Sequence, residues 1–376
     1  MKILLIHTGY YPDKDAGAIR VTTFAKMLKN IGHEPIVACY GKFDNYKIET
    51  IDGINYVSLI PRFRNFKKSV KELLYNRIIV PDLIWIYWAP FPAFIYLKKY
   101  AIKHKISLIH DSVEWYSAQG FMGKFKYTYM ERNLVNKYVI NKKFNVISIS
   151  NYLDNYYSNK KINSIVVPVL MDVKNINCDK NIENDGKIHL LYAGSPANSK
   201  EKRMKDDLLT LLNGLSSLEN NICEKVKLTL IGLNKQNILD NYNIDIDTLN
   251  VEICAKGRIP RSEVLKELTN AHFTVLLRDA NARYAKAGFP SKVVESLSTA
   301  TPVICNLSSD LSNYLKDNVN SIIIESNSSF EIKKAIKRIV TLSEDDLKKM
   351  QLNARYTAEN SFDYNLYENK IKEFLQ

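Results

Sequence analysis

The sequence predicts an α/β fold with two domains, each built on a doubly wound parallel sheet, and three observations support this. At 376 residues the chain is too long for one ordinary hydrophobic core. Its apolar residues (46%) and charged residues (25%) have the balance of a soluble globular protein. Short β-branched runs alternate with amphipathic helical stretches, which is typical of parallel sheets connected by helices.

The first 170 residues are expected to form one domain. Helical periodicity predicts helices at 18–31, 66–74 and 124–137. The nearly uncharged stretch 78–97 has the length of a membrane span, but it contains Asp82 and three prolines, so a strand, a turn and a helix are predicted instead. Apolar runs with the length of buried strands lie at 2–6, 35–39, 55–59, 83–87, 107–110, 145–150 and 164–168.

A polar stretch rich in Asn and Asp, residues 171–186, is predicted to be a linker to a second domain over residues 187–361. The amphipathic terminal segment 362–376 is expected to pack back on the first domain. Strands of the second domain are expected at 188–193, 227–231, 251–254, 273–277, 302–305 and 321–324. Helices are expected at 205–218, 261–270, 291–298 and 329–342.

The net charge of +13 is confined to the first half of the chain. Residues 1–168 hold 25 Lys and Arg against 12 Asp and Glu, whereas the remaining residues hold 28 against 28. Such a surface favours an anionic partner, such as a membrane face, a lipid phosphate, an acidic polymer or a nucleic acid. A solvated basic surface without any partner would give the same total.

The five cysteines are scattered and form no C-x-x-C pair, which argues against a disulfide framework or a zinc site and favours a reducing compartment. The apolar run 3–6 is too short for an export signal. We therefore expect a cytoplasmic protein.

Ligands of open parallel sheets bind at the carboxyl ends of the strands, and three residues of the first domain are candidates there. Gly17 stands where the first helix begins, so that backbone amides could approach an anionic or hydroxyl-rich ligand, although a plain N-cap glycine is the alternative. Arg20, one turn later, either faces the same cleft or lies on the surface. His110 ends a predicted strand and is a candidate for hydrogen bonding or proton transfer, or is a structural histidine.

Two stretches of the second domain suit a nucleotide. Gly194 ends a strand and precedes a cationic loop and a helix, which suits a diphosphate, although the loop is also explained as a solvated charge run. In the second stretch Gly288 permits close backbone approach and Ser291 starts a helix whose first amides could hold a phosphate. Glu295 lies one turn after Ser291, where its carboxylate could accept both hydroxyls of a ribose.

The second stretch, 287–295 (A-G-F-P-S-K-V-V-E), is accompanied by G-H-E at 32–34, V-P at 167–168, G-R-I at 257–259 and A-T-P-V-I at 300–304. Together they resemble the family 4 retaining glycosyltransferases of the GT-B fold. The resemblance implies two Rossmann-like domains facing an interdomain cleft, with the acceptor bound by the first and a nucleotide-sugar donor bound by the second. It also implies transfer with retention of configuration and no obligatory metal or cofactor.

The resemblance assigns roles to individual positions. Glu295 and His110 are the expected catalytic residues, Glu295 holding the donor ribose and His110 lying near the donor sugar. Gly17 corresponds to the glycine of the first loop, and with Arg20 it is expected to contact the acceptor. The expected donor-binding residues are Gly194, Ser195, Lys205, Arg258, Ile259, Ala287, Gly288, Phe289, Pro290, Ser291, Lys292 and Glu295.

One departure from the family pattern concerns Ala287. The family often has a second Glu eight positions before the one that corresponds to Glu295, and this chain has Ala287 there. The variant with Ala resembles enzymes of surface-polysaccharide assembly. It leaves two interpretations open, an active hexosyltransferase whose sugar contact comes from elsewhere, and a catalytically silent scaffold subunit of a synthase complex. The D-x-D at 245–247 lies away from the expected strand ends, so no metal site is expected there.

The expected function is transfer of a sugar from a UDP- or GDP-linked donor to a glycan or a polyprenyl-diphosphate-linked acceptor, in polysaccharide or glycoconjugate synthesis. The basic first half suits peripheral contact with the inner face of the membrane. A nucleic-acid-binding protein would share only the positive charge, because no recognisable binding module is present.

Overall fold

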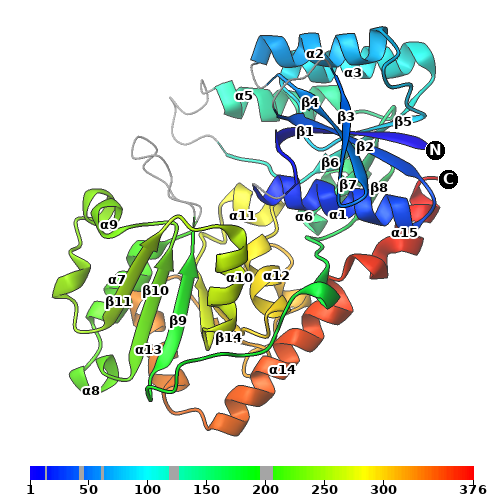
Figure 1. Cartoon of the computed structure of the whole chain (residues 1–376). Coiled ribbons are helices and arrows are strands. Elements are labelled where there is room, and N and C mark those ends of the chain that lie inside the picture. The colour runs from blue at the N-terminus through cyan, green and yellow to red at the C-terminus, as the bar shows by residue number, and fades with distance from the viewer. Residues whose placement is uncertain (13–14, 42–45, 61–62, 118–126, 195–205) are drawn as a thin grey trace. The chain divides into compact units, whose positions relative to one another are not determined.

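The computed structural model describes residues 1–12, 15–41, 46–60, 63–117, 127–194 and 206–376. The chain divides into two compact units (Figure 1). The first unit comprises Met1–Asp172, Ala282–Phe289 and Tyr364–Gln376, and the second comprises Val173–Asn281 and Pro290–Asp363. Each unit contains its own sheet and its own core, which confirms the predicted α/β fold with two parallel, doubly wound sheets.

The first unit contains an eight-stranded sheet in the order β3-β4-β2-β1-β5-β6-β7-β8. Neighbouring strands are parallel except for the β3–β4 pair, which is antiparallel. The strands are β1 (Lys2–Tyr10), β2 (Glu34–Tyr40), β3 (Ile48–Ile51), β4 (Ile54–Leu59), β5 (Leu83–Ile86), β6 (Ser107–Ser112), β7 (Asn145–Ser148) and β8 (Ser164–Val166).

Strand β3 was not predicted, and a turn explains it. Asp52 and Gly53 connect β3 to β4 and both have positive φ, +51° and +73°. A two-residue Asp-Gly turn with that geometry joins antiparallel strands. The dipeptide was therefore the signal in the sequence for this hairpin.

Helices cover both faces of the first sheet, as expected of a doubly wound fold (Figure 1). They are α1 (Ala16–Asn30), α2 (Phe63–Tyr75), α3 (Phe91–His104), α5 (Tyr127–Leu134), a π-helical turn (Val135–Val139), α6 (Asn151–Asn159), α11 (Arg283–Ala287), a 3-10 turn (Tyr364–Tyr367) and α15 (Glu368–Phe374). The stretch 78–97 forms a strand, a turn and the start of α3, as predicted. Within the described residues, no helix combines the length and the hydropathy that a membrane crossing needs.

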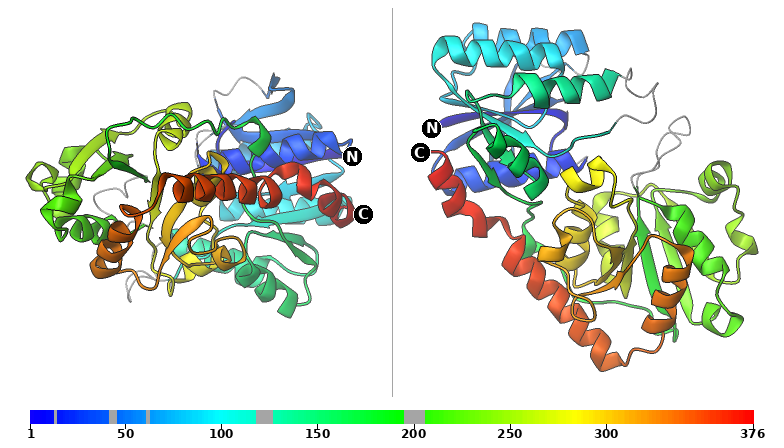
Figure 2. Two further views of the ribbon diagram at one scale, coloured as in Figure 1. Left: turned by 90° about the horizontal axis from the view of Figure 1, so that it is seen from below. Right: turned by 180° about the vertical axis from the view of Figure 1, so that it is seen from behind.

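The terminal segment is part of the first unit. Ile371 of α15 is fully buried in the core that also contains Phe24 and Trp85. Asn30 Nδ2 of α1 donates to Glu368 Oε1 over 2.9 Å, and Lys370 Nζ donates to the Val166 carbonyl over 2.8 Å. Helix α15 consequently lies beside α1, as both directions of view show (Figure 1, Figure 2).

The second unit contains a six-stranded parallel sheet in the order β11-β10-β9-β12-β13-β14. The order reverses between β9 and β12, which makes their carboxyl ends a topological switch point. The strands are β9 (Ile188–Ala193), β10 (Val226–Ile231), β11 (Glu252–Gly257), β12 (Phe273–Leu276), β13 (Val303–Asn306) and β14 (Ser321–Ile324). The helices are α7 (Leu208–Ser216), α8 (Asn220–Cys223), α9 (Lys235–Tyr242), α10 (Arg261–Thr269), α12 (Ser291–Ser298), α13 (Ser329–Ile339) and α14 (Glu344–Ser361).

Helix α12 is fixed to the sheet by a buried hydroxyl. Ser296 Oγ lies 2.6 Å from Thr274 Oγ1 of β12 and donates to the Thr301 carbonyl over 2.6 Å. Both bonds are buried, and Val293, Val294 and Leu297 are also inaccessible. This packing places the first turn of α12 at the carboxyl end of β12.

We expect Ile371→Ala to destabilise the first unit by about 2–4 kcal/mol, because truncating a buried Ile removes apolar contacts and leaves a cavity. The free energy of unfolding in urea tests this, with the exposed neighbour Lys372→Ala as the control. An unchanged unfolding midpoint for Ile371→Ala would show that the terminal segment contributes nothing to the core of the first unit.

Candidate functional site

The candidate site of the second unit lies at the carboxyl ends of β9, β12 and β13, where α12 begins. Glu295 is on this helix, and 17% of its side chain is exposed. Its Oε1 lies 3.5 Å from Nε of Arg261, the first residue of α10. Burial raises the pKa of Glu295, and the charges of Arg261 and then Lys292 oppose this rise. The carboxylate is therefore held inside the unit by a cation.

Next to Glu295, two cations share one buried carboxylate. Lys292 Nζ donates to Asp206 Oδ2, and Arg278 Nε donates to Asp206 Oδ1 over 3.0 Å. Only 5% of the Asp206 side chain is exposed. Lys292 Nζ also lies 5.2 Å from the centroid of the Tyr192 ring. Lys292 was predicted, whereas Asp206 and Arg278 were not, although Arg278 follows a predicted strand.

The start of α12 has amides available for an anion. Pro290 is the N-cap residue and makes no side-chain hydrogen bond to the first turn, and Ser291 is the first helical residue. Unoccupied amides at a helix N-terminus attract anions. Gly194, after β9, is required by packing, because a Cβ there would lie 2.4 Å from Tyr192 Oη. The predicted residues Ser195 and Lys205 lie outside the described residues.

Two of the predicted donor-binding residues, Arg258 and Ile259, follow β11. Gly257 has φ +66°, which ends the strand in a turn. Arg258 is exposed, and Ile259 packs on the small apolar cluster around Leu191 and Leu268. These residues lead into Arg261, so the turn lies at the same edge as Glu295.

Ala287, Gly288 and Phe289 belong to the first unit. Ala287 is inaccessible, and its carbonyl accepts a hydrogen bond from Ser150 Oγ over 2.7 Å. A Cβ at Gly288 would lie 3.0 Å from the Tyr284 carbonyl, which is tighter than ordinary contact. Helix α11 thus packs on α6, and Ala287 is enclosed in this contact.

Gly17 of the first unit is explained by a close approach of side chains. A Cβ at this position would lie 2.8 Å from His7 Cε1 and from the Tyr87 ring. His7, the buried residue at this contact, was missed although it follows the predicted strand 2–6. Its ring nitrogens have no hydrogen-bond partner among the described residues, and Nε2 lies 3.6 Å from Asp15 Oδ1.

The structure corrects the prediction for His110. Strand β6 continues through Ser112, so His110 lies inside the strand and not at its end. The side chain is buried against Phe94, with Nδ1 3.2 Å from the Ile86 carbonyl. Burial lowers the pKa of His110 to about 3, so the ring is neutral near pH 7.

The structure also corrects the prediction for Arg20. Its guanidinium pairs with Asp111 through Nε and Nη2, both at 2.9 Å, and donates to the carbonyls of Val167 and Pro168. Arg20 is 4% exposed, and the Asp111 side chain is inaccessible. These bonds tie α1 to β6 and to the end of the sheet, so Arg20 is buried and paired and does not lie on the surface.

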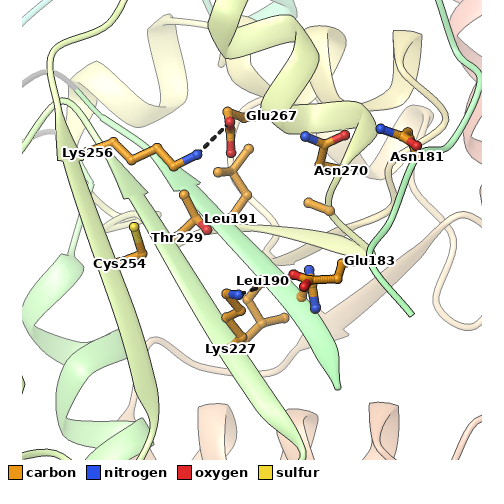
Figure 3. Close-up of a pocket in the computed structure, with 12 residues that line it drawn as sticks. Asn181, Glu183, Leu190, Leu191, Lys227, Thr229, Cys254, Lys256, Glu267 and Asn270 are labelled. Carbon is orange, nitrogen blue, oxygen red and sulfur yellow. Dashed lines mark hydrogen bonds and ion pairs between the residues drawn. The ribbon is translucent and has the colours of Figure 1, made fainter. Parts of the chain in front are cut away.

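A pocket of about 230 Å³ lies over the face of β9, β10 and β11 beside α10 (Figure 3). Its charged groups pair with one another, Lys256 with Glu267 over 2.6 Å and Lys227 with Glu183 over 3.5 Å. None of its lining residues belongs to the predicted donor set.

Beside this pocket, Glu183, Asp185 and His189 bring three possible metal-ligand atoms within 4.8 Å of one another. His189 Nε2 lies 2.9 Å from Asp185 Oδ1, and Lys227 faces Glu183. The three side chains are therefore satisfied by protein partners. The D-x-D at 245–247 caps a 3-10 turn, and Asp247 pairs with Lys235 over 2.6 Å.

Comparison with known proteins indicates one family. The profile of the glycosyl transferases group 1 matches residues 180–357. Sucrose-phosphate synthase from Thermosynechococcus elongatus has a similar structure, with a TM-score of 0.72 and 15% identity over 100% of this chain and 98% of that one. HepE of Anabaena in complex with UDP-glucose has a TM-score of 0.70 and 15% identity, and the match covers 100% of this chain and 99% of that one. WaaG, a glycosyltransferase involved in lipopolysaccharide biosynthesis, gives 0.69 and 12% over 98% of both chains. None of the curated protein sequences matches.

We expect Arg261→Met to raise the pKa of Glu295 further, because the guanidinium is the nearest cation opposing the effect of burial. The carboxyl group would then lose its negative charge at a higher pH than in the unaltered chain. An NMR titration of ¹³C-labelled glutamate carboxyls measures this, with Glu295→Gln to assign the signal. Lys256→Met, which removes the partner of Glu267, is the control and should leave the Glu295 titration in place.

Proposed function

We propose that this chain, whose residues 180–357 match the profile of the glycosyl transferases group 1, transfers a hexose, with retention of configuration, from a UDP- or GDP-linked donor. The observation that supports this most directly is the position of Glu295. Its carboxylate is held inside the second unit, one turn from an uncapped helix start and beside buried cations. A ribose needs such a carboxylate, and a diphosphate needs such cations. The complex of the similar HepE with UDP-glucose is consistent with this donor class.

The proposed reaction uses charge stabilisation on the donor side. The bond from the sugar C1 to the diphosphate oxygen breaks, and the acceptor oxygen forms the new bond to C1 on the same face. The first-turn amides of α12, Lys292 and the predicted Lys205 stabilise the charge on the leaving diphosphate. We propose that the leaving phosphate takes the acceptor proton, since burial lowers the pKa of His110 to about 3 and makes its ring a weak base.

A panel of UDP- and GDP-sugars assayed for nucleotide release, with and without a lipid-linked acceptor, tests the donor. The unaltered chain should release nucleotide from at least one donor. Glu295→Ala should lower kcat/KM roughly 10²- to 10³-fold, because two hydrogen bonds to a charged group are lost. Glu344→Gln, at the exposed start of α14, should leave the rate unchanged.

The same assay separates the enzyme from a silent scaffold, the alternative raised by Ala287. Binding of UDP or GDP would raise the melting temperature of the enzyme, whereas a scaffold need not respond. Equal rates for Glu295→Ala and the unaltered chain would refute the ribose assignment. No thermal shift with either nucleotide, together with no release from any donor, would favour the scaffold.

For the acceptor we propose a glycan or a polyprenyl-diphosphate-linked sugar at the cytoplasmic face of the membrane. The net charge of +13 in residues 1–168 supports this. Helix α2 turns Phe66, Val70 and Leu73 inward and exposes Lys67 and Lys68. The end of α2 and the segment after it expose two large apolar side chains, Tyr75 and Val80. The exposed cation Arg77 lies between them in the sequence. Cations beside apolar side chains are typical of peripheral membrane surfaces.

We expect the chain to float with vesicles that contain anionic lipid and not with neutral vesicles. Reversing Lys67 and Lys68 to Glu should reduce the bound fraction severalfold, since each cation near an anionic surface contributes about 1 kcal/mol. Reversal of Lys348 and Lys349, an exposed pair on α14, is the matched control. Equal flotation with both vesicle types would contradict electrostatic recruitment.

A further inference from the structure

The cluster of Asp206, Arg278 and Lys292 is rigidly built into the second unit. Arg278 N donates to Asn306 Oδ1 over 2.9 Å, and Asn306 Nδ2 donates back to the Arg278 carbonyl over 2.7 Å. The amide of Asp207, the residue after Asp206, donates to the Leu277 carbonyl over 2.9 Å. The segment before α7 and the ends of β12 and β13 are therefore tied together, and the cluster has a fixed place at the carboxyl edge of the sheet.

The cations of this cluster retain unused donors. Arg278 is 91% buried, yet its Nε bond to Asp206 is its one side-chain hydrogen bond within the described residues, so both Nη groups have no partner there. Lys292 uses one of its N–H groups on Asp206. Neither Nη group is an enclosed atom without a partner, so an anion can reach these donors. The place of Arg278 at the switch point beside the uncapped start of α12 makes an anion the fitting partner.

The charge balance leads to the same conclusion. In the connected ion-paired set, the cations are Arg261, Arg278 and Lys292, and the carboxylates are Asp206 and Glu295. Three positive groups against two negative ones leave a net charge of +1 in a largely buried set. A ligand with two or more negative charges near this point would be attracted, and a diphosphate has them.

We propose that Arg278 binds the diphosphate of the donor and that Asp206 is a positioning residue that holds Arg278 and Lys292 side by side for this purpose. This rests on the proposed function. Among the described residues, Asp206 takes one donor of each cation, and no other side-chain hydrogen bond of Arg278 or Lys292 is found there.

Asp206 also keeps Lys292 charged. Burial lowers the pKa of Lys292, and Asp206 is the foremost group that opposes this effect. The other groups facing Lys292 are Arg278 after β12, which lowers its pKa further, Glu295 on α12, which raises it, and the ring of Tyr192 on β9. Without Asp206 the ammonium would lose its proton at a lower pH, and its contribution to anion binding would disappear there.

The test is calorimetric binding of UDP, GDP, uridine and guanosine to the full chain. Arg278→Met should weaken binding of the preferred diphosphate about tenfold to a hundredfold, the effect of losing charge-assisted hydrogen bonds, and leave its nucleoside unchanged. Asp206→Asn should weaken binding of the diphosphate and not of the nucleoside. The pH above which the diphosphate binds no more tightly than its nucleoside should be lower for this variant than for the unaltered chain. The control is Arg338→Met, which removes the exposed residue of α13 that pairs with Asp317. This variant should bind as the unaltered chain does.

The outcomes separate this inference from the proposed function. If the unaltered chain binds neither diphosphate, the proposed function is contradicted, and the diphosphate ligand with it. If it binds one and Arg278→Met keeps the full advantage of the diphosphate over the nucleoside, the inference alone is wrong. Tighter diphosphate binding by Asp206→Asn would show that the carboxylate competes with the phosphate instead of positioning its ligands. Equal losses for nucleoside and diphosphate would indicate a purely structural role.

Discussion

The candidate site depends on how helix α12 is seated on its sheet. Ser296 bonds to Thr274 and to the Thr301 carbonyl, both buried, so the helix cannot slide without leaving hydroxyls unpaired. These hydrogen bonds fix the position of the first turn of α12. The helical period then directs Glu295 toward Arg261 of α10 and Lys292 toward Asp206. One interior hydroxyl thus positions an anion-attracting helix start and two charged side chains.

Two buried arginines, Arg20 and Arg278, differ in how many of their donors have a partner. Arg20 and Asp111 are more deeply buried than Arg278, but every side-chain nitrogen of Arg20 has an oxygen partner, two of them backbone carbonyls. Such a guanidinium stabilises the fold and has nothing left to offer. Arg278 satisfies its backbone through Asn306, and its Nη groups have no partner within the described residues. The two arginines therefore differ in their unpaired donors and not in exposure, which is why we propose binding for Arg278 alone.

The sequence predicted the two parallel sheets because β-branched runs and helical periods are local properties. Helix α12 was predicted at its observed bounds, and with it the inward direction of Glu295. The surroundings of His110 and Arg20 differ from those expected for a tertiary reason. Strand β6 extends two residues beyond its predicted end, which moves His110 into the sheet, and Arg20 meets Asp111 from 91 positions away. Asp206 is 72 and 86 positions from its partners, so no local pattern could reveal the cluster.

Ala287 shows how a departure from a family pattern can be a requirement of packing. In this chain α11 rests on α6, the Ala287 carbonyl is held by Ser150, and Arg283 lies over the Trp115 ring at 5.1 Å. A glutamate at 287 would place a larger, charged side chain at an inaccessible position, where a carboxylate is costly unless it is paired. The segment that leads into Gly288 is therefore anchored in the first unit by backbone and aromatic contacts, which need no carboxylate. An alanine at 287 is then compatible with the proposed activity, because the cations proposed to bind the donor belong to the second unit.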